Sequence, residues 1–118
     1  MLPKRYRLTR SDDFCRVRED GECLTTRRLV LCYRPNGGDV PRIGFSVSRR
    51  VGGAVVRNRI KRRLRAGMRP LCTVLEPGWD MVVIARQLAS QATGPQLSAD
   101  LDRLLGQAHL LRVGTHDA

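Results

Sequence analysis

Residues 42–65 read RIGFSVSRRVGGAVVRNRIKRRLR, and they change from the pattern of a strand to the pattern of a helix. Its first part alternates apolar residues with small or polar ones, which predicts a strand over 42–48 with two different faces. The apolar face carries Ile43, Phe45 and Val47, and the opposite face carries Arg42, Gly44, Ser46 and Ser48. Gly52-Gly53 ends this pattern, and from Ala54 onward apolar residues recur every three or four positions. A helix with one buried stripe is therefore expected directly after the strand. The stripe consists of Val56, Ile60, Leu64, Met68, Leu71 and Leu75.

The same reasoning predicts elements on both sides of this centre. Thr9 and Asp12 fit a capping box that starts a first helix, and Pro70 is expected to kink or end the basic helix. Residues 87–94 read as a loop. The predicted helices cover 11–19, 54–69 and 96–108, and the predicted strands cover 22–24, 29–33, 42–48 and 79–85. The order α-β-β-β-α-β-α predicts a single α+β domain with one sheet and helices packed on it.

The positive charge is concentrated in one part of the chain. Residues 40–75 hold ten Lys and Arg and no Asp or Glu, in a protein of 118 residues with formal net charge +11. On a helical wheel the polar residues opposite the apolar stripe share an arc of about 140°, with Arg59 and Arg63 lying apart from it. The arc contains Arg57, Asn58, Lys61, Arg62, Arg65 and Arg69.

This one-sided arrangement favours a polyanionic partner. Like charges at i,i+4 destabilise an isolated helix slightly, and here no acid offsets them. Guanidinium groups match phosphate oxygens, and the amide of Asn58 suits a ribose hydroxyl or a base edge. We therefore expect RNA binding. A membrane-surface helix is disfavoured, because the apolar stripe is needed for the core.

Other classes of function lack support in the sequence. Cys15, Cys23, Cys32 and Cys72 form no C-x-x-C pair and no His clusters with them, so we expect reduced thiols rather than a zinc site. No apolar run approaches the length of a membrane span, and no secretory signal follows the basic start, so the expected location is cytoplasmic. His109 and His116 lie near the C-terminus without a catalytic motif.

Four stretches, in this order, resemble the protein component of bacterial ribonuclease P. They are Arg7-Leu8 with Asp13-Phe14, Arg42 through Arg50, Ala54 through Arg65, and Asp80 through Arg86. The similarity extends from residue 5 to about residue 110. The resemblance implies a compact α-β-β-β-α-β-α sandwich whose mixed sheet contains an unusual left-handed βαβ crossover. We expect this domain to cover residues 1–113 and to leave a loose tail over 114–118.

The resemblance also implies a function. The family's ribonucleoprotein is an endoribonuclease that removes the 5′ leader from precursor tRNA. Its catalytic RNA holds most of the Mg²⁺, so this chain is expected to supply no catalytic residue and to bind no metal stably on its own. The implied partners are the catalytic RNA and precursor tRNA, with the protein monomeric in the complex. The alternative is a ribosomal or RNA-chaperone protein, which would show the same charge and size.

Site residues follow from matching positions to the family's motifs. The contacts expected with the RNA subunit are Arg49, Arg50, Arg57, Asn58, Lys61, Arg62, Arg65 and Arg69. The cleft expected to receive the leader contains Phe14, Arg18, Cys32, Ser46 and Ser48. Many family members have an aromatic residue where this sequence has Arg18 and Cys32, so leader binding here is expected to use less stacking and more charge.

Overall fold

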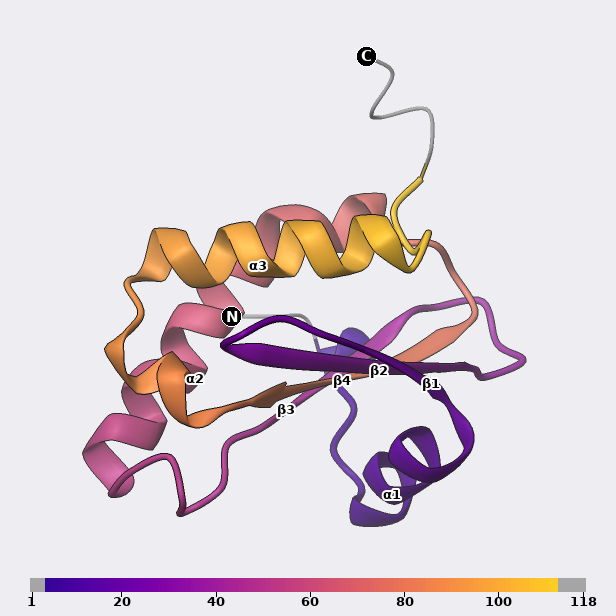
Figure 1. Cartoon of the computed structure of the whole chain (residues 1–118). Helices are drawn as coiled ribbons and strands as arrows, with labels where there is room; N and C mark the ends of the chain where they lie inside the picture. The colour runs from indigo at the N-terminus through magenta and orange to yellow at the C-terminus, as the bar shows by residue number, and fades with distance from the viewer. Residues whose placement is uncertain (1–3, 113–118) are drawn as a thin grey trace.

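A computed structural model describes residues 4–112 and shows a four-stranded sheet with helices on both faces (Figure 1). The α-helices are α1 (Ser11–Asp20), α2 (Ala54–Met68) and α3 (Gly94–Gln107). The strands are β1 (Glu22–Thr25), β2 (Leu29–Pro35), β3 (Arg42–Ser46) and β4 (Trp79–Ala85). Short 3-10 helices are η1 (Lys4–Tyr6), η2 (Arg69–Val74) and η3 (Gln87–Gln91). The predicted order of helices and strands is confirmed, whereas the predicted tail over 114–118 lies outside the described residues.

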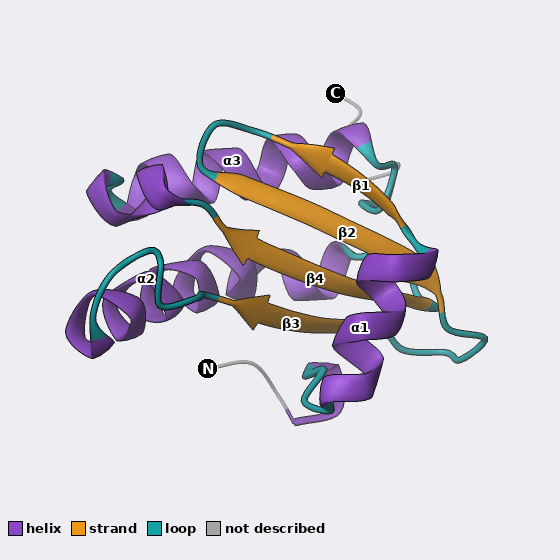
Figure 2. Cartoon of the chain, turned by 60° about the horizontal axis from the view of Figure 1, so that its bottom comes forward, coloured by secondary structure: helices purple, strands orange, loops and turns teal. Residues whose placement is uncertain are grey.

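The sheet is mixed, as the fold prediction required. Its strand order is β1-β2-β4-β3, with β1–β2 and β2–β4 antiparallel and β3–β4 parallel. Because parallel neighbours cannot be joined by a hairpin, the chain crosses over through α2. Figure 2 shows α1 in front of the sheet and α2 behind it. If the strands in that view are turned to point upward, β4 lies to the right of β3, so the crossover is left-handed and opposite to the usual hand.

The main core lies between the sheet and the pair α2 and α3. Ile60, Leu64 and Met68 of the predicted stripe are fully buried there. Along β2 and β4 alternate residues enter this core, because successive side chains of a strand point to opposite faces. They are Leu29, Leu31, Met81 and Val83. From α3 the core receives Leu97, Leu101, Leu104 and Leu105.

The opposite face of the sheet has a smaller core under α1. Val17 is buried there together with Leu8, Cys32 and Val82, and the ring of Phe14 packs against this cluster. The helix therefore covers only part of this face, and its inner side carries Phe14 toward β3.

Several local predictions need correction. α1 begins at Ser11 after Arg10, and no side chain caps it, so the predicted capping box at Thr9 is wrong. The capping box occurs instead at α3, where the Thr93 hydroxyl accepts from the Gln96 amide at 3.2 Å and the Gln96 side chain accepts from the Thr93 amide at 3.0 Å. Residues 87–91 form η3 rather than a loop.

The ends of β3 and α2 show what stops each element. β3 ends at Ser46 rather than Ser48, because the chain turns there and the Val51 amide donates to the Ser48 carbonyl at 3.1 Å. α2 ends at Met68, and Pro70 lies in the following η2, as expected for a residue without an amide hydrogen. No helix among residues 4–112 is long and apolar enough to cross a membrane.

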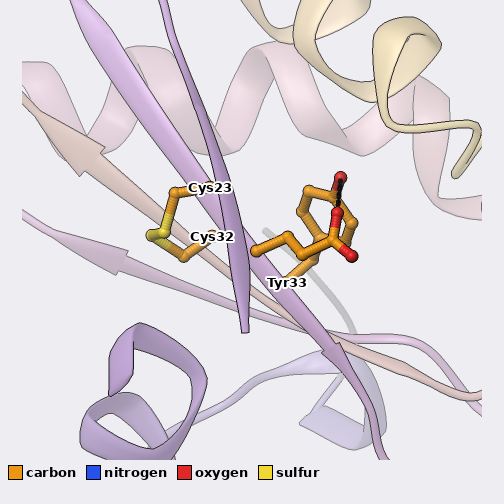
Figure 3. Close-up of a disulfide and its surroundings, with 4 residues drawn as sticks. Cys23, Cys32 and Tyr33 are labelled. Atoms are coloured by element: carbon orange, nitrogen blue, oxygen red, sulfur yellow. Dashed lines mark hydrogen bonds between the residues drawn. A yellow bond between two sulfur atoms is a disulfide. The ribbon is translucent and has the colours of Figure 1, made fainter. Parts of the chain in front are cut away.

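The expectation of four reduced thiols is wrong for one pair. Cys23 of β1 and Cys32 of β2 are directly opposed in the antiparallel register, and their sulfur atoms are bonded (Figure 3). Cys15 is free and exposed, and Cys72 is free and buried. The spacing of nine residues between Cys23 and Cys32 resembles no cysteine motif, so only the strand register reveals the pair.

Candidate nucleic-acid interface

The cationic face predicted for α2 lies on the solvent side of that helix. Arg62, Arg65, Arg69 and Asn58 are exposed, whereas Arg57 and Lys61 are half-buried. The Nε atom of Arg57 donates to the Gly52 carbonyl at 3.2 Å, which draws this side chain toward the start of the helix. Between residues 4 and 112 no carboxylate forms an ion pair with an α2 cation. The positive charge of this face is therefore not neutralised within the described part of the protein.

Arg59 and Arg63, which the helical wheel sets apart, have a structural role. Arg59 Nη2 donates to the Ser90 carbonyl at 3.4 Å, and Arg63 Nη1 donates to the Ala92 carbonyl at 2.6 Å. These bonds hold the segment around η3 against α2. The two arginines that the helical wheel sets apart from the cationic arc are thus the ones that bond to the neighbouring segment.

Phe14 lies directly over β3 at Gly44. A Cβ atom built on Gly44 would overlap the Phe14 ring and lie only 2.8 Å from its Cε1 atom. Gly44 is thus required for the far end of the Phe14 ring to approach the strand this closely. The alternation predicted for 42–48 puts Gly44 on the face opposite Phe45, and in the structure α1 packs on the Gly44 face.

A cavity of about 340 Å³ joins the two predicted sites. The segment before α1 runs along the outer edge of β3, where the Leu8 amide donates to the Ile43 carbonyl at 2.8 Å. The cavity extends from Phe14 around this edge to Lys61 and Arg65 of α2. Its remaining lining residues are Arg7, Leu8, Thr9, Ile43, Gly44 and Phe45. One hollow therefore offers an aromatic ring and several cations, which suits a base and its phosphates.

The other residues predicted for the leader cleft lie outside the lining of this cavity. Ser46 is half-buried at the end of β3, and Ser48 is exposed in the turn that follows. Arg18 is exposed on α1, one helical turn beyond Phe14. Cys32 is 3% exposed, and its sulfur is bonded to Cys23, so the side chain offers little surface to a ligand. Arg49 and Arg50 are exposed in the turn that leads to α2.

One cation on the α1 side of the sheet is already paired. Arg42 Nε and Nη2 donate to the two carboxylate oxygens of Asp80, each at 2.8 Å, and Asp13 lies 3.9 Å from Arg42 Nη1. Asn36 Nδ2 also donates to Asp80 at 3.0 Å. The hydrogen bonds with Asp80 raise the pKa of Arg42 above its ordinary value. This group links β3, β4 and α1, so Arg42 serves the fold rather than a ligand.

A second basic surface was missed by sequence reasoning. Three neighbouring depressions lie beyond the end of β4, around Arg27, Arg86 and the 47% exposed Leu88. Arg86 Nη1 donates to the Thr26 carbonyl at 2.9 Å, which ties β4 to the β1–β2 turn. Arg50 and Arg103 also line these depressions. No sequence signal joins these residues, because they come from four separate segments.

The residues described by the structure offer no ready metal site. Between residues 4 and 112 no group of three His, Cys, Asp or Glu side chains is arranged to hold an ion.

Comparison with known proteins decides the family. The family model for ribonuclease P matches residues 2–109 of this chain. The chain belongs to the ribonuclease P protein family. The ribonuclease P protein component of Roseiflexus castenholzii is 44% identical over 112 residues, which cover 94% of this chain and 92% of the relative. The ribonuclease P protein component of Beutenbergia cavernae is 48% identical over 103 residues, which cover 86% of this chain and 87% of the relative.

Solved structures of the family share the fold. The Staphylococcus aureus ribonuclease P protein superposes with a TM-score of 0.83 at 33% identity, covering 91% of this chain and 98% of its own. The Thermotoga maritima ribonuclease P protein superposes with a TM-score of 0.78 at 32% identity, covering 86% of this chain and 96% of its own. Membership of the ribonuclease P family makes this chain an RNA-binding protein of tRNA processing and the protein component of a ribonuclease.

Proposed function

We propose that this chain binds the catalytic RNA of ribonuclease P and the 5′ leader of precursor tRNA, and so assists removal of the leader. The observation that carries the proposal is the cavity shared by Phe14, Lys61 and Arg65. It places an aromatic ring at the border of the unneutralised cationic face of α2. A single strand held in the cavity would therefore continue onto an RNA held by the helix.

The α2 face suits the RNA subunit. Its cations lie on one side of a rigid helix that is fixed to the core by Ile60 and Leu64. Binding phosphates there releases counterions from the RNA, which makes affinity strongly dependent on salt. Asn58 adds a neutral donor and acceptor among the cations. Arg49 and Arg50 extend the same charge into the turn before α2.

The cavity suits an unpaired nucleotide of the leader. A base can stack on Phe14 while neighbouring phosphates meet Lys61 and Arg65. Arg18, Ser46 and Ser48 lie outside the cavity lining, and we expect them to contact the leader backbone beyond it. Mature tRNA lacks a leader, so the protein would favour the precursor over the product.

The side chains of this protein position RNA and screen charge, and none takes part in bond cleavage. We propose that the Mg²⁺ ions which support hydrolysis are held mainly by the RNA subunit, as the family resemblance implies. The chain's contribution is to lower the repulsion between two large polyanions. Its effect should therefore be largest when Mg²⁺ is scarce.

Reconstitution tests the proposal. The purified chain is added to a bacterial ribonuclease P RNA and precursor tRNA, and cleavage is measured at low and at high Mg²⁺. We expect enhanced cleavage at low Mg²⁺ and a fading effect at high Mg²⁺. A K61A/R65A variant should lose the enhancement, whereas R16A, which removes an exposed arginine outside both surfaces, should keep it. Absence of any enhancement by the natural chain would contradict the proposal.

Binding to matched RNAs separates this function from its alternative. A ribosomal or RNA-chaperone protein would bind precursor and mature tRNA alike. The proposed function requires tighter binding of the precursor in the presence of the RNA subunit. Equal affinities in that complex would favour the alternative.

A further inference from the structure

The bond between Cys23 and Cys32 lies at an edge of the sheet. β1 pairs with β2 alone among the described strands, it has four residues, and three of them are exposed. Cys23 is exposed on this strand. Cys32 is buried on the neighbouring strand, in the cluster that contains Val17 of α1. Figure 3 shows the two sulfur atoms bridging the pair of strands.

We propose that Cys23 and Cys32 form a thiol–disulfide exchange site for low-molecular-weight thiols and disulfides, and that its bond fastens β1 to the sheet. The register supports this assignment, because the two residues are direct partners with Cα atoms 4.1 Å apart. That distance is typical of a pair without backbone hydrogen bonds between its own members, in which opposed side chains approach each other closely.

The accessibility of the two sulfur atoms sets the order of the exchange. In the reduced protein the exposed thiolate of Cys23 attacks a small disulfide, forming a mixed disulfide and releasing one thiolate. The thiolate of Cys32 then attacks the Cys23 sulfur and releases the second thiolate. Two electrons and two protons pass from the protein to the small disulfide, which leaves as two thiols. Reduction runs through the same steps in reverse.

Apart from its antiparallel pairing with β2 and the disulfide, few contacts hold β1 in place. Its side chains contribute only Leu24 to the packing against the main core. The hydrogen bond from the Tyr33 hydroxyl to Glu22 Oε1 is long, at 3.5 Å, and solvent-exposed (Figure 3). Opening the disulfide should therefore loosen β1 more than any other strand.

The first experiment follows the thiols of the protein alone and needs no RNA. A C15A variant removes the exposed free thiol, and peptide mass spectrometry after alkylation reads Cys23, Cys32 and Cys72 separately. The protein is equilibrated with mixtures of glutathione and glutathione disulfide. We expect Cys23 and Cys32 to become protected together in one two-electron transition while Cys72 does not change. If each of Cys23 and Cys32 is alkylated to the same extent in the most reducing and the most oxidising mixtures, the proposed exchange site is wrong.

The second experiment follows the backbone of β1. Hydrogen exchange of its amides should be faster after reduction by up to about a hundredfold, the factor expected when a cross-link that closes a loop of about ten residues is opened. Exchange in β4 should not change. A C15A/C23S variant should exchange at the fast rate under both conditions, and its retained circular dichroism would show that it folds. Equal rates in β1 of the oxidised and reduced protein would overturn the fastening role.

Discussion

The ring of Phe14 occupies the space in which any side chain at Gly44 would have to lie. This relationship joins α1 to β3 across the face of the sheet that α1 only partly covers. Both residues line the cavity, together with Lys61 and Arg65. Any change at position 44 is therefore transmitted to the ring.

A Gly44→Ala substitution should displace Phe14. Overpacking of this kind costs about 1–3 kcal/mol of stability, and we expect the preference for precursor over mature tRNA to fall as well. Thermal unfolding and binding of both RNAs measure the two effects. Gly106→Ala is the matched control, because a Cβ there meets nothing within 4 Å. It should leave the RNA preference unchanged, and an equal loss in both variants would argue against the Phe14 cavity.

A Phe14→Ala substitution should weaken binding of the leader more than binding of the RNA subunit. Loss of one stacked base corresponds to about 1–3 kcal/mol of binding free energy. Phe14 is half-buried, so its removal should destabilise the fold by less than the roughly 3–5 kcal/mol of a fully buried phenylalanine. Affinities for precursor and for the RNA subunit, measured beside a melting curve, separate the roles. Equal weakening of both affinities would assign Phe14 to the core alone.

Arg62 and Arg63 are adjacent in sequence but should behave differently when replaced by alanine. Arg62 is exposed on the cationic face, so R62A should reduce the salt slope of RNA binding by about one unit for a lost phosphate contact. The melting temperature of the R62A variant should equal that of the natural chain. Arg63 bonds to the Ala92 carbonyl, so R63A should lower the melting temperature and leave the slope nearly intact. The opposite pattern would place the RNA on the other side of α2.

The group formed by Arg42, Asp80 and Asn36 should be important for folding. Asp80→Ala removes the acceptor of three hydrogen bonds, which come from the half-buried side chains of Asn36 and Arg42. We expect a loss of about 2 kcal/mol or more in unfolding free energy. Denaturant titration measures it. The double variant R42M/D80L should recover part of the loss, because neither partner is then left alone.

Burial raises the pKa of the Cys72 thiol above its ordinary value of 9.0. The unfolded chain therefore releases this proton at lower pH than the folded chain does. Below about pH 9 the protonated Cys72 thiol therefore makes its full contribution to the free energy of unfolding. This contribution is lost as pH rises through the higher pKa of the folded protein. Melting temperatures between pH 8 and pH 10 should fall less steeply in a Cys72→Ala variant. The same burial should make Cys72 react with iodoacetamide much more slowly than exposed Cys15.

The elements with clear periodicity were predictable from the sequence. Alternation between Ile43 and Phe45 and the stripe from Ile60 to Met68 indicated the strand, the helix and the faces that each would bury. The wheel also separated the free cations from Arg59 and Arg63, because a single helix fixes their directions without any tertiary information. The left-handed crossover came from the family resemblance alone, since general rules favour the opposite hand.

Features that depend on distant segments were not predictable. The Cys23–Cys32 bond requires the register of β1 on β2, and sequence spacing does not give that register. The cavity joins α1 and α2 only because the chain before α1 runs along β3. The capping box was assigned to Thr9 because Asp12 has the right spacing, whereas the structure uses Thr93 and Gln96. Sequence spacing identifies possible capping boxes, whereas the path of the backbone determines which of them forms.

The path of Arg7 and Leu8 along the outer edge of β3 has a consequence for self-association. An open strand edge is a template for pairing with another molecule. Here the Leu8 amide already bonds to Ile43, and Arg7 bridges to the same residue. The opposite edge is β1, which has only four residues. The sheet therefore offers a second copy of the chain only a short stretch of strand with which to pair.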